Sequence, residues 1–178
     1  MDTVRITSGE YKGRKITTPG GGTHPMGERE RIALFNMIAE YLPGASVLDA
    51  FAGSGALGIE ALSRGANSVL FIEKDSRACT VINNNLKNLG IDGSRGGVIK
   101  ANVYQELANM TSSFSLVVAD PPYDEYDEQR IKALAQVVAK PDGILVLSHP
   151  GETPEMPGMK LLKTRKYASA HISIFVCV

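Results

Sequence analysis

The feature that most constrains the fold is a regular alternation of strand-like and helix-like segments that begins at residue 46. Strand-like segments are predicted at 46–51, 68–73, 97–101, 114–119 and 143–148. The last two are nearly continuous apolar runs, as expected for strands that are buried on both faces. Helical patterns separate several of these segments, at 56–63, 76–89 and 127–139. Such alternation favours a mainly parallel sheet with helices on both faces. The sequence therefore predicts an α/β, Rossmann-like fold.

The two ends of the chain depart from this alternation. Residues 4–18 alternate in polarity around glycines and predict a small β-hairpin, and the glycine-rich loop 19–27 cannot be helical. Apolar residues at helical spacing then predict a helix over 28–42, which a Pro-Gly pair ends. The last two segments, 160–167 and 170–178, are separated by a short turn and predict an antiparallel pair of strands. We expect a seven-stranded, mostly parallel sheet with an antiparallel C-terminal strand.

The length of 178 residues suits one main domain. We expect an N-terminal appendage over residues 1–27, a catalytic domain over residues 28–178, and a monomer. No apolar run is long enough to span a bilayer, and the start of the chain lacks a signal-peptide pattern. The two cysteines, Cys79 and Cys177, form no disulfide or metal framework, so we expect core thiols, no metal, and a cytoplasmic protein.

The charges balance overall, with 19 basic and 19 acidic residues, but the basic ones are unevenly distributed. One cluster lies near the start of the chain, and a second lies late in it, with no acidic residue after Glu155. Basic patches can bind phosphates, although solvated strand faces explain the same pattern equally well.

A glycine-rich loop between the strand at 46–51 and the helix at 56–63 indicates a nucleotide cofactor. Gly53, Gly55 and Gly58 satisfy the G-x-G-x-x-G pattern, in which glycines allow a tight turn and close approach of a ligand. Glu73 ends the next strand, where a carboxylate can accept hydrogen bonds from ribose hydroxyls. These residues predict a cofactor that contains adenosine.

Asp49 indicates which cofactor this is. A carboxylate just ahead of the glycines would repel the pyrophosphate of a dinucleotide. It would instead attract the amino group of S-adenosylmethionine, directly or through water. The alternative for Asp49 is a residue that only caps the loop.

The tetrapeptide Asp120-Pro121-Pro122-Tyr123 indicates the reaction. It follows a buried strand, at the sheet edge where open α/β folds bind ligands. The Asp120 carboxylate and the Pro121 carbonyl can accept both hydrogens of an exocyclic amine, which frees the nitrogen lone pair for attack on a methyl group. Tyr123 offers a flat face to a base lifted from its stack. The segment predicts methylation of an amino nitrogen on a nucleobase; a simple surface turn is the alternative.

Three further segments extend the pattern, and they are Arg5-Ile6 with Lys12-Gly13-Arg14-Lys15, Glu28-Arg29-Glu30-Arg31 before Leu34-Phe35-Asn36, and the whole stretch from Leu48 to Ala66. With them, the chain resembles the RsmD family of small-subunit (16S) ribosomal RNA guanine-N2 methyltransferases over essentially its whole length. The resemblance implies that the substrate is guanine N2 in ribosomal RNA, within an assembling small subunit.

The resulting assignment has three groups of residues. The predicted catalytic residues are Asp120, Pro121, Pro122 and Tyr123. The predicted cofactor-binding residues are Asp49, Phe51, Ala52, Gly53, Ser54, Gly55, Glu73, Lys74, Asn102 and Asp120. The predicted RNA-binding residues are Arg5, Lys12, Arg14, Lys15, Arg29 and Arg31.

Four residues depart from the family pattern, namely His24, Met26, Asn102 and His149. His24-Pro25-Met26 replaces the usual Arg-Pro-Thr, and Asn102 replaces an Asp that meets the adenine amino group, although its side-chain carbonyl can accept the same bond. His149 stands where an acid is usual, and we expect a surface or partly buried histidine there.

Other functions fit parts of the pattern. The tetrapeptide also permits methylation of adenine N6 in DNA or RNA, or of another amide or amine nitrogen such as that of a protein glutamine. The glycines permit a nicotinamide-dependent oxidoreductase, against which Asp49 counts. A non-catalytic RNA-binding module is a further alternative.

Overall fold

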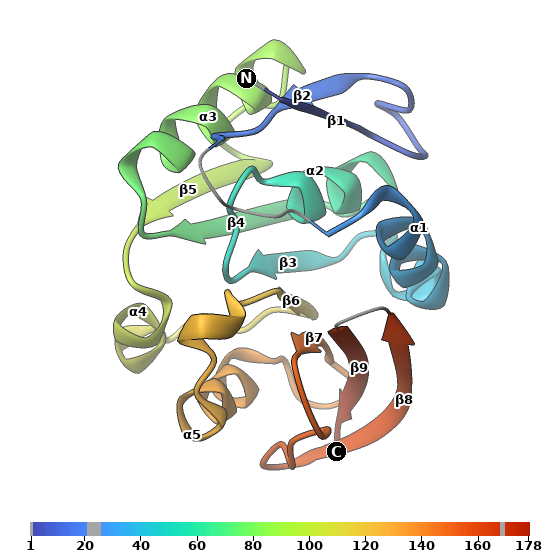
Figure 1. The fold of residues 1–178 in the computed structure, drawn as a ribbon, viewed down its shortest axis with the longest axis vertical. Coiled ribbons are helices and arrows are strands. Elements are labelled where there is room, and N and C mark those ends of the chain that lie inside the picture. Colours follow the sequence, from blue (N-terminus) through green and yellow to red (C-terminus); the bar gives the residue numbers. More distant parts are fainter. Residues whose placement is uncertain (1, 21–25, 168–169) are drawn as a thin grey trace.

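The computed structural model describes residues 2–20, 26–167 and 170–178. Within these residues, a seven-stranded sheet has the order β5-β4-β3-β6-β7-β9-β8 (Figure 1). Its strands are β3 (Ser46–Asp49), β4 (Ser68–Glu73), β5 (Gly96–Lys100), β6 (Leu116–Ala119), β7 (Ile144–His149), β8 (Met159–Tyr167) and β9 (Ala170–Cys177). Neighbours from β5 to β7 are parallel, and β9 is antiparallel to β7 and β8. The predicted fold class is confirmed.

Helices cover both faces of this sheet. One face packs against α1 (Glu28–Met37), α2 (Ala56–Ser63) and α3 (Ser76–Asn88). The other packs against α4 (Val103–Asn109), α5 (Glu128–Ile131) and the 3-10 segment η3 (Lys132–Val137). Side chains alternate between faces along a strand, so Val118 of β6 joins the first core and Val117 the second. Burial on both faces explains the unbroken apolar runs. The buried free thiols of Cys79 and Cys177 fit the prediction of core cysteines.

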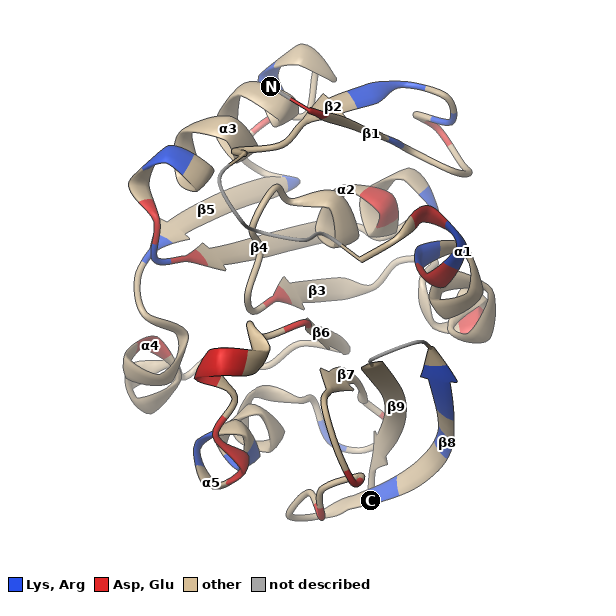
Figure 2. Cartoon of the chain, in the orientation of Figure 1, with Lys and Arg blue, Asp and Glu red and all other residues tan. Residues whose placement is uncertain are grey.

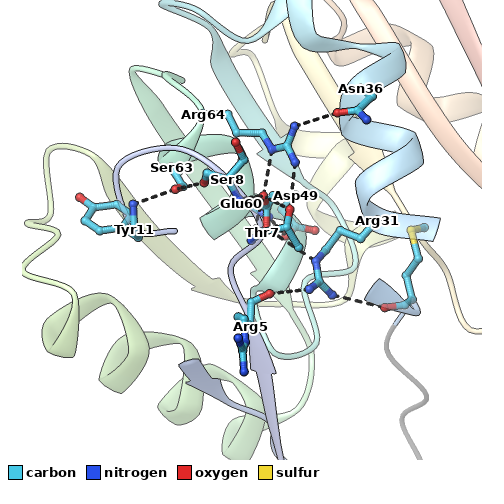
Figure 3. Close-up of polar contacts among 12 residues, drawn as sticks. Arg5, Thr7, Ser8, Tyr11, Arg31, Asn36, Asp49, Glu60, Ser63 and Arg64 are labelled. Atoms are coloured by element: carbon cyan, nitrogen blue, oxygen red, sulfur yellow. Dashed lines mark hydrogen bonds and ion pairs between the residues drawn. The ribbon is translucent and has the colours of Figure 1, made fainter. Parts of the chain in front are cut away.

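The N-terminal residues form the predicted hairpin, with β1 (Thr3–Arg5) antiparallel to β2 (Lys15–Thr17). A buried carboxylate on α2, Glu60, fastens it to the domain (Figure 3). Glu60 accepts hydrogen bonds from the Thr7 N–H at 2.9 Å, the Ser8 N–H at 3.1 Å and the Arg64 Nε at 2.9 Å. The hairpin therefore sits directly on the helix that follows the glycine loop.

The segment 127–139 differs from its prediction. One continuous helix was expected, but the α-helix ends after four residues and continues as η3. Ile131, Leu134 and Val137 are all fully buried and lie three residues apart. That spacing matches the three residues per turn of a 3-10 helix, so tighter winding keeps all three in the core. The helix expected over 28–42 likewise ends at Met37 and is followed by the 3-10 turn η1 (Ala39–Tyr41).

Two short elements near the sheet were not predicted, namely α4 and the 3-10 turn η2 (Tyr123–Glu125). Most of the predicted loop 19–27, with His24 and Pro25, lies outside the described residues, as does the turn at 168–169. The division of the chain at residue 27 stays a prediction. Among the described residues, no helix combines the length and apolar character needed to cross a membrane.

Candidate functional site

A cleft of about 740 Å³ opens at the carboxyl ends of β3, β4 and β6. It brings together segments that lie far apart in the sequence, because parallel strands end at the same edge of the sheet. The predicted cofactor and catalytic residues that line it are Phe51, Ala52, Gly53, Ser54, Glu73, Lys74, Asn102, Asp120, Pro121, Pro122 and Tyr123. Two others, Asp49 and Gly55, lie behind this lining.

The glycine loop turns from β3 into α2. Gly55 stands at the start of α2 with a left-handed backbone, at φ 79°. Gly58 lies against β4 so closely that a Cβ on it would be 2.3 Å from the Phe71 ring. The third glycine of the pattern therefore serves the packing of helix on strand, and the first two shape the loop at the cleft.

Asp49 supports the loop from beneath. Its carboxylate is buried, and Oδ2 accepts a 2.9 Å hydrogen bond from the Gly58 N–H in the first turn of α2. Oδ1 has no hydrogen-bond partner within the described part of the chain. The pKa of Asp49 is raised to about 7, chiefly by burial and also by the charges of Asp120 and Glu73, whereas the Gly58 hydrogen bond lowers it. The structure thus shows the capping contact considered as the alternative, together with one unused oxygen.

Glu73 forms the second wall of the cleft. Its Oε2 accepts a 2.9 Å hydrogen bond from the Gly53 N–H, and its Oε1 accepts a 2.8 Å bond from the Asp75 N–H. Each carboxylate oxygen can accept a second bond, so Glu73 keeps acceptor capacity towards the cleft. The residue both fixes the glycine loop and offers the acceptors that ribose hydroxyls need.

Asn102 and two aromatic residues form a further wall. The Asn102 Oδ1 accepts a 3.0 Å hydrogen bond from the Tyr104 N–H and so caps α4. The Tyr104 ring meets Phe51 edge to face, with centroids 5.7 Å apart, and both rings line the cleft. These rings provide an apolar surface for a flat ligand beside the carbonyl of Asn102.

The tetrapeptide Asp120-Pro121-Pro122-Tyr123 lies opposite the glycine loop, directly after β6. Burial raises the pKa of Asp120, and the hydroxyl of Ser148 opposes this rise. The Tyr123 hydroxyl lies 2.8 Å from the Ser148 Oγ, and burial also raises the pKa of Tyr123. Ser148, on β7, therefore touches the tyrosine and acts on the carboxylate of this segment.

An ion pair joins the two sides of the cleft mouth. The Lys74 Nζ contacts the Glu125 carboxylate of η2, and about half of each side chain is exposed. Both residues line the cleft. Lys74, predicted to contact the cofactor, thus has a partner on the opposite wall.

The predicted RNA-binding residues fall into two groups. Arg5, Lys12, Arg14, Lys15 and Arg29 are exposed, and the first four belong to the hairpin segment. Arg31 is only 2% exposed, donates a 2.6 Å hydrogen bond to the Arg5 carbonyl, and lies 3.7 Å from Glu60 (Figure 3). Its assignment to RNA binding is corrected, because a side chain that is almost wholly buried and held in this way binds the hairpin to α1.

His149 also differs from expectation. It is completely buried, neither at the surface nor partly buried, with Nε2 2.8 Å from the Ser173 Oγ and its ring stacked 5.6 Å from that of His171. Burial and the neighbouring His171 lower the pKa of His149.

Sequence reasoning missed Ser148, Tyr104 and Glu60. Ser148 is a single polar residue at the end of an apolar strand, and Tyr104 lies on a helix that was not predicted. Glu60 lies within the segment from Leu48 to Ala66, but its hairpin partners, Thr7 and Ser8, lie 53 and 52 positions away in the sequence. No local pattern reports such contacts.

Known proteins match the chain over most of its length. A sequence profile described as "Conserved hypothetical protein 95" matches residues 4–176. YlbH of Bacillus subtilis, named as a candidate rRNA methyltransferase, is 35% identical over 97% of this chain and 98% of its own length. Ribosomal RNA small subunit methyltransferase D of Escherichia coli is 39% identical over 67% of this chain, a match that spans 60% of the E. coli protein.

Solved structures agree. The Escherichia coli protein yhhF, named as a candidate methyltransferase, superposes with a TM-score of 0.88 at 29% identity, covering 99% of this chain and 98% of its own. The profile match over nearly the whole chain and the full-length relative establish the family. The chain belongs to the RsmD family, which the small-subunit ribosomal RNA methyltransferases D represent.

Proposed function

We propose that this chain transfers a methyl group from S-adenosylmethionine to the exocyclic N2 of a guanine in small-subunit ribosomal RNA. Family membership supports a methyltransferase that acts on ribosomal RNA. Methylation of an amino nitrogen is supported by one observation above all. Asp120-Pro121-Pro122-Tyr123 lies in the same cleft as the glycine loop and Glu73. The choice of guanine N2 follows from the family resemblance.

The residues at the loop side of the cleft fit S-adenosylmethionine. Glu73 has acceptor capacity for ribose hydroxyls, and Phe51 and Tyr104 offer apolar faces for adenine. Asp49 lies behind the cleft lining, and its buried Oδ1, which has no partner among the described residues, would attract a positive ligand head directly or through water and would oppose a pyrophosphate. Bound S-adenosylmethionine supplies an electrophilic methyl group.

At the opposite wall, the chain's own residues hold and activate the amine. The Asp120 carboxylate accepts one amino hydrogen and the Pro121 carbonyl accepts the other. Together they orient the nitrogen lone pair towards the methyl group and stabilise the positive charge that develops on the nitrogen. As the nitrogen–carbon bond forms and the carbon–sulfur bond breaks, the surplus amino proton passes to Asp120 or to water, and S-adenosylhomocysteine is released. Tyr123, whose hydroxyl is fixed by Ser148, presents its ring to the base. Positioning of this kind contributes roughly 7–11 kcal/mol at most.

The test is methyl incorporation into small ribosomal subunits that lack the modification, followed by nucleoside analysis of the product. We expect labelled N2-methylguanosine. The Asp120→Ala protein is the matched control, and we expect it to bind S-adenosylhomocysteine while its methyl transfer falls by about 10²-fold or more. N6-methyladenosine as the product would support the alternative base, and full activity of Asp120→Ala would contradict the role of the tetrapeptide.

A further inference from the structure

The edge strand β8 is exposed on both of its faces. It pairs only with β9, and residues 160–166 are all exposed, whereas the middle of β9 is buried. Leu161 and Leu162 are 45% and 46% exposed. The helices that cover the rest of the sheet thus leave seven consecutive residues of this strand open to solvent.

This exposed strand is strongly basic. It carries Lys160, Lys163, Arg165 and Lys166, and residues 156–178 contain no Asp or Glu. Within the described residues, none of these four side chains has an ion-pair or hydrogen-bond partner. Four uncompensated charges in seven residues repel one another and suit a polyanion. Figure 2 shows this basic strand at the edge of the sheet.

A register shift aligns three of the charges. Lys160, Lys163 and Arg165 lie opposite Val176, Ile174 and Ile172 of β9, and the shift falls between Leu161 and Lys163. Residues opposite each other in an antiparallel pair share a face. Without the shift, Lys160 and Lys163 would point to opposite faces, because their separation is odd. The three cations therefore form a row on the sheet face that α1 covers elsewhere.

The row leads to the cleft. Tyr167, at the end of β8, lines the cleft, as does Ile172, which lies opposite Arg165. The cleft lining itself is acidic, and its carboxylates are Glu30, Glu73, Asp75, Asp120, Asp124 and Glu125. Only two cations, Arg31 and Lys74, line it within the described part of the chain, and both are paired with carboxylates. An RNA that places a base in this cleft must keep its phosphates outside, on a basic surface.

We propose that β8 binds the phosphate backbone of the substrate RNA next to the methylated nucleotide, through Lys160, Lys163 and Arg165. This inference rests on the proposed function. Lysines on an edge strand also prevent pairing with other strands, but that role requires neither three charges on one face nor continuity with the cleft.

The test compares two triple variants that lose the same charge. The first is K160Q/K163Q/R165Q. The matched control is R77Q/K87Q/K100Q, which removes exposed cations from α3 and from β5, the opposite edge of the sheet. Binding to a fragment of small-subunit ribosomal RNA is measured over a range of salt concentrations. Methylation kinetics and S-adenosylhomocysteine affinity are measured in parallel.

We expect the β8 variant to bind the RNA at least about tenfold more weakly, with a KM for RNA raised by a similar factor. The slope of log affinity against log salt should become shallower by about 2, since each single-strand phosphate contact contributes about 0.7. Its kcat at saturating RNA and its S-adenosylhomocysteine affinity should match those of the wild type, and the control variant should keep at least most of its RNA affinity.

Several results would overturn the proposal. An unchanged salt slope, or equal losses in the two variants, would show that β8 does not contact phosphates. Lost activity on assembled subunits with full affinity for naked RNA would assign β8 to a protein partner. A wild-type dimer that the variant abolishes would assign it to a second copy. The proposed function can also fail by itself. In that case the wild type methylates no ribosomal RNA, yet the β8 variant alone binds RNA more weakly and with a shallower salt dependence, which would still show that β8 contacts phosphates.

Discussion

Ser148 connects two residues on which the proposed chemistry depends. Its hydroxyl lies 2.8 Å from that of Tyr123, and it lowers the pKa of Asp120, which burial raises. Asp120 stabilises the positive charge that develops on the amino nitrogen far better as a carboxylate than in its protonated form. Because Ser148 favours the ionised form of Asp120, it extends the activity of the site to lower pH.

We expect Ser148→Ala to move the acid limb of the kcat profile to higher pH. Without the hydroxyl, burial acts unopposed on Asp120, so at low pH a larger fraction of this carboxyl is protonated in the variant than in the wild type. The loss of activity should be greatest at low pH. Tyr123→Phe is the control, because it removes the other hydroxyl and leaves Ser148 beside Asp120. An equal loss at every pH in Ser148→Ala would contradict this role.

Glu73 gives a second prediction at the residue scale. In Glu73→Gln, one carboxylate oxygen becomes an amide nitrogen, which cannot accept from the Gly53 or Asp75 N–H. We expect S-adenosylhomocysteine to bind about tenfold more weakly, while kcat at saturating cofactor changes little. Isothermal titration and steady-state kinetics measure the two quantities. Intact affinity would show that Glu73 does not contact the cofactor.

At the scale of elements, the sequence predicts those segments whose ends carry local signals. The bounds of α2 follow from the glycines on either side of it, and β4 follows from an apolar run that ends at Glu73. The segment 127–139 was mispredicted because apolar residues at 131, 134 and 138 fit an α-helical pattern, while the 3-10 winding depends on the core they meet. Ser148 escaped prediction because its importance comes from Tyr123, 25 residues away.

The docking of the hairpin on α2 depends on Glu60. In Glu60→Ala, the buried Arg31 loses its charged neighbour, and the Thr7 and Ser8 N–H groups lose their acceptor. We expect a loss of roughly 3–5 kcal/mol in the free energy of unfolding. Glu40→Ala, an exposed site close to α1, should change it by less than about 0.5 kcal/mol. Denaturant unfolding gives both values, and equal effects would contradict the role of Glu60.

The contact between α2 and β4 depends on Gly58. A methyl group there would lie 2.3 Å from the Phe71 ring and 2.8 Å from the Val69 side chain. We expect Gly58→Ala to cost roughly 1–3 kcal/mol of stability and to weaken S-adenosylhomocysteine binding, because α2 must move and the glycine loop moves with it. Gly93→Ala, where nothing lies within 4 Å of the added carbon, is the control. Unchanged stability and affinity would show that the side chains around Gly58 accommodate the methyl group without moving the glycine loop.

At the scale of the whole molecule, the cleft lining differs in charge from two parts of the surface. Carboxylates line the cleft, whereas groups of exposed cations lie on the hairpin and on β8. The zero net charge of the chain therefore conceals a surface suited to a substrate with a neutral base and anionic phosphates. The carboxylates near the cleft also affect the stability of the fold, because the charges of Asp120 and Glu73 help to raise the pKa of the buried Asp49.

Asp49 should make the free energy of unfolding depend on pH. Its pKa is about 7 in the folded protein, against an ordinary value of 3.8. Between these values the folded chain keeps a proton that the unfolded chain releases, so stability falls as pH rises from about 4 to about 7. The full effect is of the order of 4 kcal/mol, at about 1.4 kcal/mol per pH unit. Asp49→Asn cannot ionise, and it keeps an oxygen for the Gly58 N–H. We therefore expect its stability, relative to the wild type, to rise from pH 5 to pH 8 in urea unfolding. A difference that does not change with pH would show that Asp49 ionises normally in the folded chain.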